Sequence, residues 1–234
     1  MKWDKLKKKA WESNIMLNNS GMAPLTFGNV SAIDRKAGVF AIKPSGIPYD
    51  ELSPDDMVVI DMNLRQIDGK LNPSSDTKTH AVLYRKFQLI GGIAHAHPPY
   101  SVAWAQAMKP IPILGTTHAD LTAHDIPCTN QMSNKKIKLD YEEETGNLIL
   151  ECFSKISYLD VPMVLVANHG PFTWGESPEK AVENCIILEE IAKMALFTLI
   201  IDNKTPRLRK SLINKHYQRK HGTKAYYGQK NRNL

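Results

Sequence analysis

The chain has 234 residues, of which 42% are hydrophobic, so it can bury a sizeable core, and we expect a single domain over residues 1–234. No apolar run approaches the length that crosses a bilayer, and the charged N-terminus lacks the apolar core of a signal peptide, so we expect a soluble cytoplasmic protein without a membrane partner. The three cysteines are widely spaced, which predicts neither a disulfide framework nor a thiolate zinc site.

The formal net charge of +6 is concentrated at the C-terminus. Ten of the 30 Lys and Arg residues lie from Asn203 to Leu234, where there is no acidic residue, so the preceding chain has 20 basic and 24 acidic residues. A basic tail is typical of an RNA-binding arm or of a solvated extension. This tail also contains His216, Tyr217, Tyr226 and Tyr227. That mixture favours docking onto a specific surface.

The first third of the chain predicts one helix and several strands. Helical spacing of apolar residues predicts an amphipathic helix over residues 1–17, and two β-like runs at 29–33 and 39–43 predict a hairpin. The hairpin leads into Lys43-Pro44-Ser45-Gly46, a turn that can direct backbone N–H groups outwards. A helical turn is expected from Ser53, followed by a buried strand over 57–62.

A run of small hydroxyl residues, 73–77, precedes a predicted helix over 78–86. Free backbone N–H groups at a helix start commonly hold phosphate, but the same residue types cap ordinary helices. Asp76 could therefore be a helix cap, a metal ligand or a base.

Two histidines stand two residues apart in the apolar run Gly91–Pro98. In an extended strand, His95 and His97 project from the same face, which suits chelation of a metal ion. Pro98 and Pro99 end the strand directly after them. A pair of ordinary histidines on a polar sheet face is the alternative.

A third histidine follows a second apolar strand. We expect a helix over 101–108, a loop over 115–120 and a helix over 142–156, and then a strand from Met163 that ends at His169. Because two buried strands each deliver imidazole at their ends, His169 is the natural third ligand. The longest predicted helix, 178–200, is apolar over much of its surface. This breadth indicates that the helix is buried, either within the chain or in part against another subunit.

Seven motifs occur together in one order. They are Gly28-Asn29-Val30-Ser31, Lys43-Pro44-Ser45-Gly46, Pro73-Ser74-Ser75-Asp76, His95-Ala96-His97, Gly115-Thr116-Thr117-His118-Ala119-Asp120, His169-Gly170-Pro171-Phe172, and the stretch 220–229 that ends in Tyr226-Tyr227-Gly228-Gln229. With them the chain resembles the L-ribulose-5-phosphate 4-epimerases of the class II aldolase superfamily, from the first helix to Gln229. The resemblance implies an α/β fold, a single-domain α/β/α sandwich with a central, mostly antiparallel sheet.

The resemblance also implies the roles of individual residues. His95, His97 and His169 would bind Zn²⁺, or another divalent metal such as Mn²⁺ or Co²⁺, with Asp76 beside or on the metal. The residues expected to hold the substrate, chiefly its phosphate, are Gly28, Asn29, Ser45, Gly46, Ser74, Ser75 and Thr116. Asp120 and Tyr227 correspond to an acid/base pair. The tail from about residue 203, with His216 and Arg219, would reach the active site of a neighbouring subunit in a homotetramer.

The implied reaction interconverts L-ribulose 5-phosphate and D-xylulose 5-phosphate. Direct deprotonation at C4 is difficult because no carbonyl group is adjacent, so cleavage of the C3–C4 bond and re-addition is the easier route. The sequence leaves open whether arabinose, ascorbate or another sugar acid supplies the substrate. The segments 98–100 and 121–124 depart from the family pattern, so the family's substrate preference does not carry over to this chain in detail.

Two alternatives remain open. A class II sugar-phosphate aldolase of the L-fuculose or L-rhamnulose type typically has glutamate after the serine pair, whereas Asp76 is one methylene shorter. The ending Tyr226–Gln229 also favours an epimerase. A nucleic-acid-binding protein that uses the basic tail and a structural zinc is less well supported, because structural zinc sites usually have four protein ligands. We therefore expect no nucleic-acid partner.

Overall fold

The computed structural model describes residues 2–223 and 225–226. Its helices are α1 (Asp4–Asn19), η1 (Pro54–Asp56), α2 (Thr77–Lys86), α3 (Pro99–Gln106), α4 (Thr116–Leu121), α5 (Asn134–Leu139), α6 (Tyr141–Cys152), α7 (Pro178–Ile201) and α8 (Lys210–His221). Its strands are β1 (Asn29–Asp34), β2 (Val39–Ile42), β3 (Val58–Asp61), β4 (Gln66–Asp68), β5 (Gly92–His95), β6 (Met163–Leu165) and β7 (Pro171–Gly175).

Within the described residues, seven strands form one sheet in the order β4-β3-β2-β1-β5-β7-β6. Every neighbouring pair of strands is antiparallel. The predicted hairpin is β1 and β2, with Ser31 opposite Ile42. On its other side β1 pairs with β5, so Asn29 stands opposite His95 at the end of both strands.

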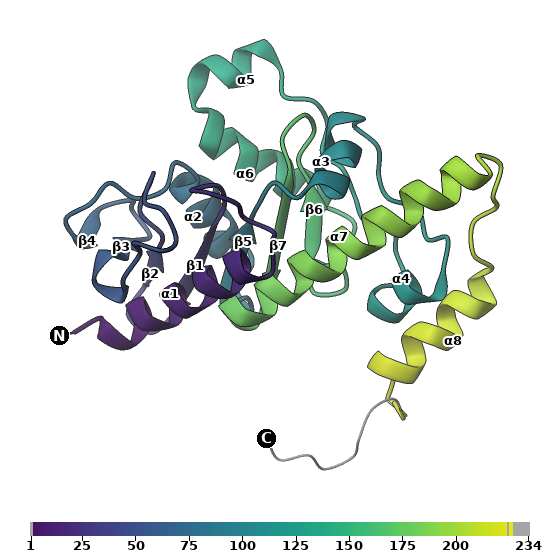
Figure 1. Cartoon of the computed structure of the whole chain (residues 1–234), viewed down its shortest axis with the longest axis horizontal. Helices are drawn as coiled ribbons and strands as arrows, with labels where there is room; N and C mark the ends of the chain where they lie inside the picture. The colour runs from purple at the N-terminus through teal and green to yellow at the C-terminus, as the bar shows by residue number, and fades with distance from the viewer. Residues whose placement is uncertain (1, 224, 227–234) are drawn as a thin grey trace.

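Alternation along the strands separates two hydrophobic layers. In β2, Val39 and Ala41 pack into the core that contains residues of α1 and α7, whereas Phe40 and Ile42 pack into the core that contains residues of α2 and α6. Side chains two residues apart share a sheet face, so each strand contributes to both layers. The predicted α/β/α sandwich with a mostly antiparallel sheet is thereby confirmed, with helices on both faces of the sheet (Figure 1).

The segment 115–120 differs from its prediction. The sequence predicts a loop, but residues 116–121 form α4, in which His118 and Ala119 are buried. A helix of six residues shows almost no periodicity in a sequence, and it is stabilised by packing rather than by intrinsic propensity. Here α4 packs against α8 (Figure 1).

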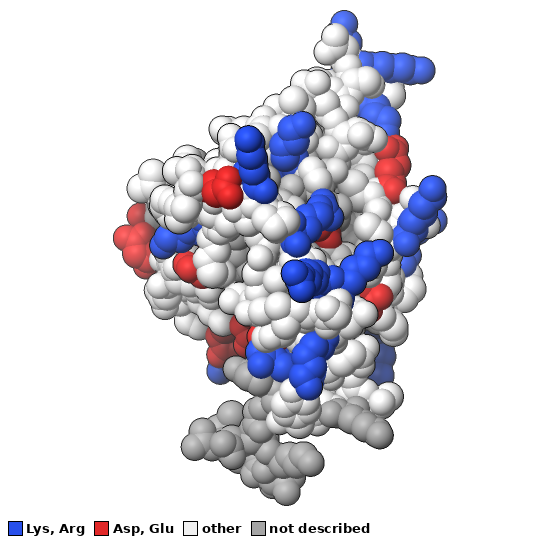
Figure 2. All heavy atoms as spheres, turned by 90° about the vertical axis from the view of Figure 1, so that its right-hand side faces the viewer, with Lys and Arg blue, Asp and Glu red and all other residues white. Residues whose placement is uncertain are grey.

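The far end of α7 reaches past the sheet towards α4 and α8 (Figure 1). None of the residues of α8 is buried, and its last turn carries Arg219, Lys220 and His221. Figure 2 views the molecule from this side and shows Lys and Arg side chains spread over the face. Among the residues that the structure describes, no helix has both the length and the apolar character that a membrane span requires.

Candidate functional site

Three histidines meet where β5 ends. His95 is the last residue of β5, His97 follows it by two residues, and His169 lies in the turn between β6 and β7. The turn brings its backbone close to β5: a Cβ atom added to Gly170 would lie 3.1 Å from the carbonyl oxygen of Ala96 and 3.1 Å from Cδ2 of His97. Glycine at position 170 therefore allows His169 to approach the other two rings.

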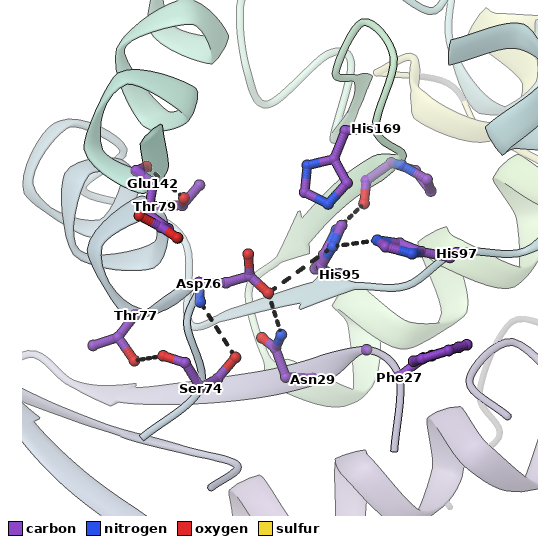
Figure 3. A network of polar contacts seen from close by, with 12 residues as sticks. Phe27, Asn29, Ser74, Asp76, Thr77, Thr79, His95, His97, Glu142 and His169 are labelled. Carbon is purple, nitrogen blue, oxygen red and sulfur yellow. Dashed lines mark hydrogen bonds and ion pairs between the residues drawn. The ribbon is translucent and has the colours of Figure 1, made fainter. Parts of the chain in front are cut away.

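The three rings present their nitrogens to one another. The Nε2 atoms of His95 and His97 are 2.9 Å apart, and one ligand atom from each of the three histidines lies within 4.8 Å of the others (Figure 3). Nδ1 of His95 lies 2.8 Å from the carbonyl oxygen of Pro171, which can only accept a hydrogen bond. The proton of His95 is thus on Nδ1, and the lone pair of its Nε2 faces the other histidines. This arrangement fits a metal ion held by imidazole.

The surroundings of the three histidines favour the neutral form of each imidazole. Burial lowers the pKa of His95, His97 and His169, that of His169 to about 4, and neighbouring imidazoles lower each pKa further. The Asp76 carboxylate offsets these effects only in part. Metal binding requires neutral imidazole, so the site needs no deprotonation step near pH 7.

Asp76 occupies the N-cap position of α2, but its side chain makes no capping hydrogen bond. Instead, Oδ2 accepts a hydrogen bond from Nδ2 of Asn29 at 2.7 Å and lies 3.9 Å from Nε2 of His95 (Figure 3). Burial raises the pKa of Asp76, but the nearby His95, His80 and His169 rings and the Asn29 hydrogen bond outweigh it and lower the pKa overall. Of the three roles considered, the side-chain helix cap is wrong, whereas a place beside the three histidines fits.

A cavity of about 370 Å³ opens beside the histidines. It is lined by Thr26, Phe27, Gly28, Asn29, Lys43, Pro44, Ser45, Gly46, Ser74, Ser75, Asp76, His95, His97, Tyr141, Glu142 and His169. Ten of these are residues that the sequence predicts for metal or substrate binding, every one of the predicted set except Thr116, Asp120, His216, Arg219 and Tyr227. Segments far apart in the chain therefore converge on one cavity.

Sequence reasoning missed four polar side chains of this cavity. They are Thr26, Lys43, Tyr141 and Glu142. The Lys43 ammonium is buried, donates to the carbonyl oxygen of Ile47 at 2.7 Å and makes no ion pair among the described residues. Burial lowers the pKa of Lys43 to about 8. Lys43 belongs to a motif that predicts a turn. The sequence signal that could have identified it as a site residue is the lack of an acidic residue beside it.

The remaining predicted site residues lie elsewhere on this chain. Thr116 and Asp120 are on α4, and His216 and Arg219 are on α8. Asp120 accepts hydrogen bonds from Nδ1 of His216 at 3.0 Å and Nε of Arg219 at 2.9 Å. Burial raises the pKa of Asp120, but these two hydrogen bonds lower it overall. Tyr227 lies outside the described residues.

Comparison with solved structures identifies several proteins of the same fold. An L-fuculose 1-phosphate aldolase is 23% identical, with a TM-score of 0.77, and the match covers 92% of this chain and 95% of that one. The L-fuculose 1-phosphate aldolase of Glaciozyma antarctica PI12 is 16% identical, with a TM-score of 0.75 and coverage of 93% and 82%. YgbL of Escherichia coli is 21% identical, with a TM-score of 0.70 and coverage of 93% and 100%.

The sequence profile of one protein family matches most of the chain. That family is described as the class II aldolase and adducin N-terminal domain, and the match runs over residues 9–196. These residues include the three histidines, Asp76 and the strands that hold them. The chain therefore belongs to the class II aldolase and adducin N-terminal domain family.

Proposed function

We propose that this protein is a metal-dependent epimerase that interconverts L-ribulose 5-phosphate and D-xylulose 5-phosphate by cleaving and re-forming the C3–C4 bond. The observation that carries the proposal is the meeting of His95, His97 and His169 with Asp76 at one end of a polar cavity. Zn²⁺ is the proposed metal, and Mn²⁺ or Co²⁺ would suit the same ligands. A divalent metal, when bound, polarises a carbonyl group and stabilises the negative charge that develops when a neighbouring bond breaks.

Other residues that line the cavity suit a phosphate group. Ser45, Gly46, Ser74 and Ser75 line it, and Lys43 adds a buried positive charge. Hydroxyl groups, free backbone N–H groups and an ammonium are the donors that phosphates prefer. Holding the phosphate also retains the cleaved fragment, which favours re-addition over release.

Asp120 and Tyr227 are the proposed acid and base. In one chain, Asp120 does not line the cavity, so we propose that a second chain completes each site, with the tail from about residue 203 placed at the boundary. Exposed apolar residues at the end of α7 support a subunit contact, because Phe197 is 46% exposed, Ile200 67% and Ile201 87%. We propose a cytoplasmic homotetramer.

A class II sugar-phosphate aldolase is the second candidate. Two of the similar structures named above are L-fuculose 1-phosphate aldolases, and the same cavity could cleave a sugar phosphate without re-addition. Asp76, in place of the longer glutamate expected in such aldolases, favours the epimerase.

The two functions are separated by their products. We would incubate the zinc-loaded protein with L-ribulose 5-phosphate and follow D-xylulose 5-phosphate and free glycolaldehyde phosphate in parallel. Xylulose phosphate without free aldehyde, lost after chelation, is the expected result. Free aldehyde as the main product would assign the protein to the aldolases, and the absence of turnover with bound metal would refute the proposed substrate.

The acid/base assignment has its own test. D120A and Y227F should slow epimerisation while the zinc content stays at the wild-type level. Wild-type rates in both variants would contradict the assignment.

A further inference from the structure

Tyr141 lies next to the histidine that joins the triad from the β6–β7 turn. Its hydroxyl oxygen is 3.3 Å from Nδ1 of His169, and the centroids of the two rings are 6.1 Å apart. Within the described residues, this is the hydrogen bond made by the His169 side chain. Tyr141 therefore contacts the side of the ring away from Nε2.

The position of Tyr141 is set by rigid elements. Tyr141 is the first residue of α6, and both of its chain neighbours are tied to α2: Asp140 pairs with the Lys78 ammonium, and the carbonyl oxygen of Glu142 accepts from Oγ1 of Thr79 at 2.6 Å. The two helices also pack closely, since a Cβ atom added to Gly146 would lie 2.7 Å from Cβ of Val82. The phenol ring of Tyr141 is thus positioned by α6 and its contacts with α2, and not by the loop that carries His169.

His95 shows what such a contact does to an imidazole. Its Nδ1 proton is donated to the carbonyl oxygen of Pro171, and this leaves the Nε2 lone pair facing the centre of the triad. His169 is on a turn in which Asn168 has a φ of 63°, and within the described part of the chain its ring makes no hydrogen bond to strand backbone. A partner for its Nδ1 must therefore come from another element, and Tyr141 supplies an oxygen that can accept.

We propose that Tyr141 is a positioning residue of the metal centre: its phenolic oxygen accepts the Nδ1 proton of His169 and so orients Nε2 towards His95 and His97. The inference rests on the proposed function, because it takes the three histidines as metal ligands. Partners of this kind determine the tautomer and rotation of a ligating ring, and their removal typically weakens metal affinity about 10- to 100-fold.

Metal titration tests the proposal. Zn²⁺ affinity of the chelator-stripped protein would be measured against a chromophoric chelator for wild type, Y141F and Y158F. Y141F keeps the ring and removes only the hydroxyl, and Y158F makes the same change at a tyrosine that stacks on Phe87, the C-cap residue of α2. We expect about 10- to 100-fold weaker binding for Y141F, an altered Co²⁺ absorption spectrum, and wild-type behaviour for Y158F.

The outcomes separate this inference from the proposed function. If wild type binds metal and Y141F binds it equally well, the role of Tyr141 is refuted and the metal centre stands. If wild type binds no metal, both fail. A second measurement needs no variant of Tyr141: ¹⁵N spectra of the metal-free wild type should show His169, assigned by its loss in H169Q, with its proton on Nδ1. A proton on Nε2 would overturn the proposal.

Discussion

The side-chain amide of Asn29 donates a hydrogen bond to Oδ2 of Asp76 across 2.7 Å, and so joins the first strand of the sheet to the start of α2. Asn29 also stands opposite His95 in the β1–β5 pair. One side chain thus connects the Asp76 carboxylate, the strand that ends at His95 and the cavity. Asn29 is expected to bind substrate, and the structure adds that it orients Asp76.

Removal of this amide should impair activity more than stability. In N29A the Asp76 carboxylate loses a donor, and a hydrogen bond to a charged group contributes about 1.5–3 kcal/mol, so we expect kcat/KM to fall at least about 10-fold. The three histidines are unchanged, so the zinc content should stay near the wild-type value. Steady-state kinetics together with metal analysis checks this prediction, and wild-type kinetics in N29A would refute it.

Gly28 and Gly46 provide a matched pair of substitutions. Both have left-handed backbone conformations, with φ of 76° and 72°. A Cβ atom at Gly28 would lie 2.8 Å from the carbonyl oxygen of His95, whereas one at Gly46 meets nothing within 4 Å. We expect G46A to lower the free energy of unfolding by about 1 kcal/mol, and G28A by at least about 2 kcal/mol because the strand at His95 must shift.

Denaturant unfolding of both variants measures this difference. Equal losses of stability in G28A and G46A would show that the contact between Gly28 and His95 does not constrain the strand.

Two buried histidines outside the triad predict how stability depends on pH. Burial lowers the pKa of His80 to about 3 and that of His118 to about 4. In the unfolded chain an imidazole has a pKa of about 6.5, so below that pH the unfolded state binds more protons than the folded state, and stability falls as pH falls. The stabilising effect is complete above pH of about 6.5 and is lost towards pH of about 4.

We expect the metal-free protein to lose at least about 2 to 3 kcal/mol of unfolding free energy between pH 7.5 and pH 5.5, near 1.4 kcal/mol for each of these two histidines and each pH unit below about 6.5. The three histidines of the triad, whose pKa values are also lowered, add to this loss. Denaturant titrations after treatment with a chelator test this without the separate effect of pH on metal binding. Equal or greater stability at pH 5.5 would contradict it.

Asp120 holds α8 against α4. It accepts hydrogen bonds from His216 and Arg219, and its side chain is only 14% exposed. D120N keeps the shape and removes the charge, so we expect amide hydrogen exchange over residues 210–221 to accelerate about 5- to 10-fold. E183Q, which removes the charge of an exposed pair with Lys180 on α7, is the control and should leave exchange in α8 unchanged. Unaltered exchange in D120N would show that other contacts hold the helix.

The sheet and the triad could be predicted because their signals are local. Alternating apolar residues define β1 and β2, and the histidines sit directly at the ends of apolar runs. The short helices α4 and α5 could not be predicted in this way, since six residues hold too little periodicity and tertiary contacts stabilise them.

The cavity likewise combines residues that a local sequence pattern indicates with residues that only tertiary packing brings there. Its serines and glycines belong to turn and helix-start motifs that are visible in the sequence. Tyr141 and Glu142 come to the cavity only because α6 packs on α2, and no local pattern indicates that proximity. The roles of Asp120, His216, Arg219 and Tyr227 stay predictions, since they concern a second chain.

The three imidazoles come from two distant points of the chain, residues 95–97 and residue 169, and the intervening segment contributes only β6 to the sheet. A metal bound at both points would close this excursion, which contains α3, α4, α5 and α6, into a loop. Such a site does not form in the unfolded chain, so the free energy of metal binding would add to the free energy of folding. The metal site would then also hold together a segment that makes up about a third of the polypeptide.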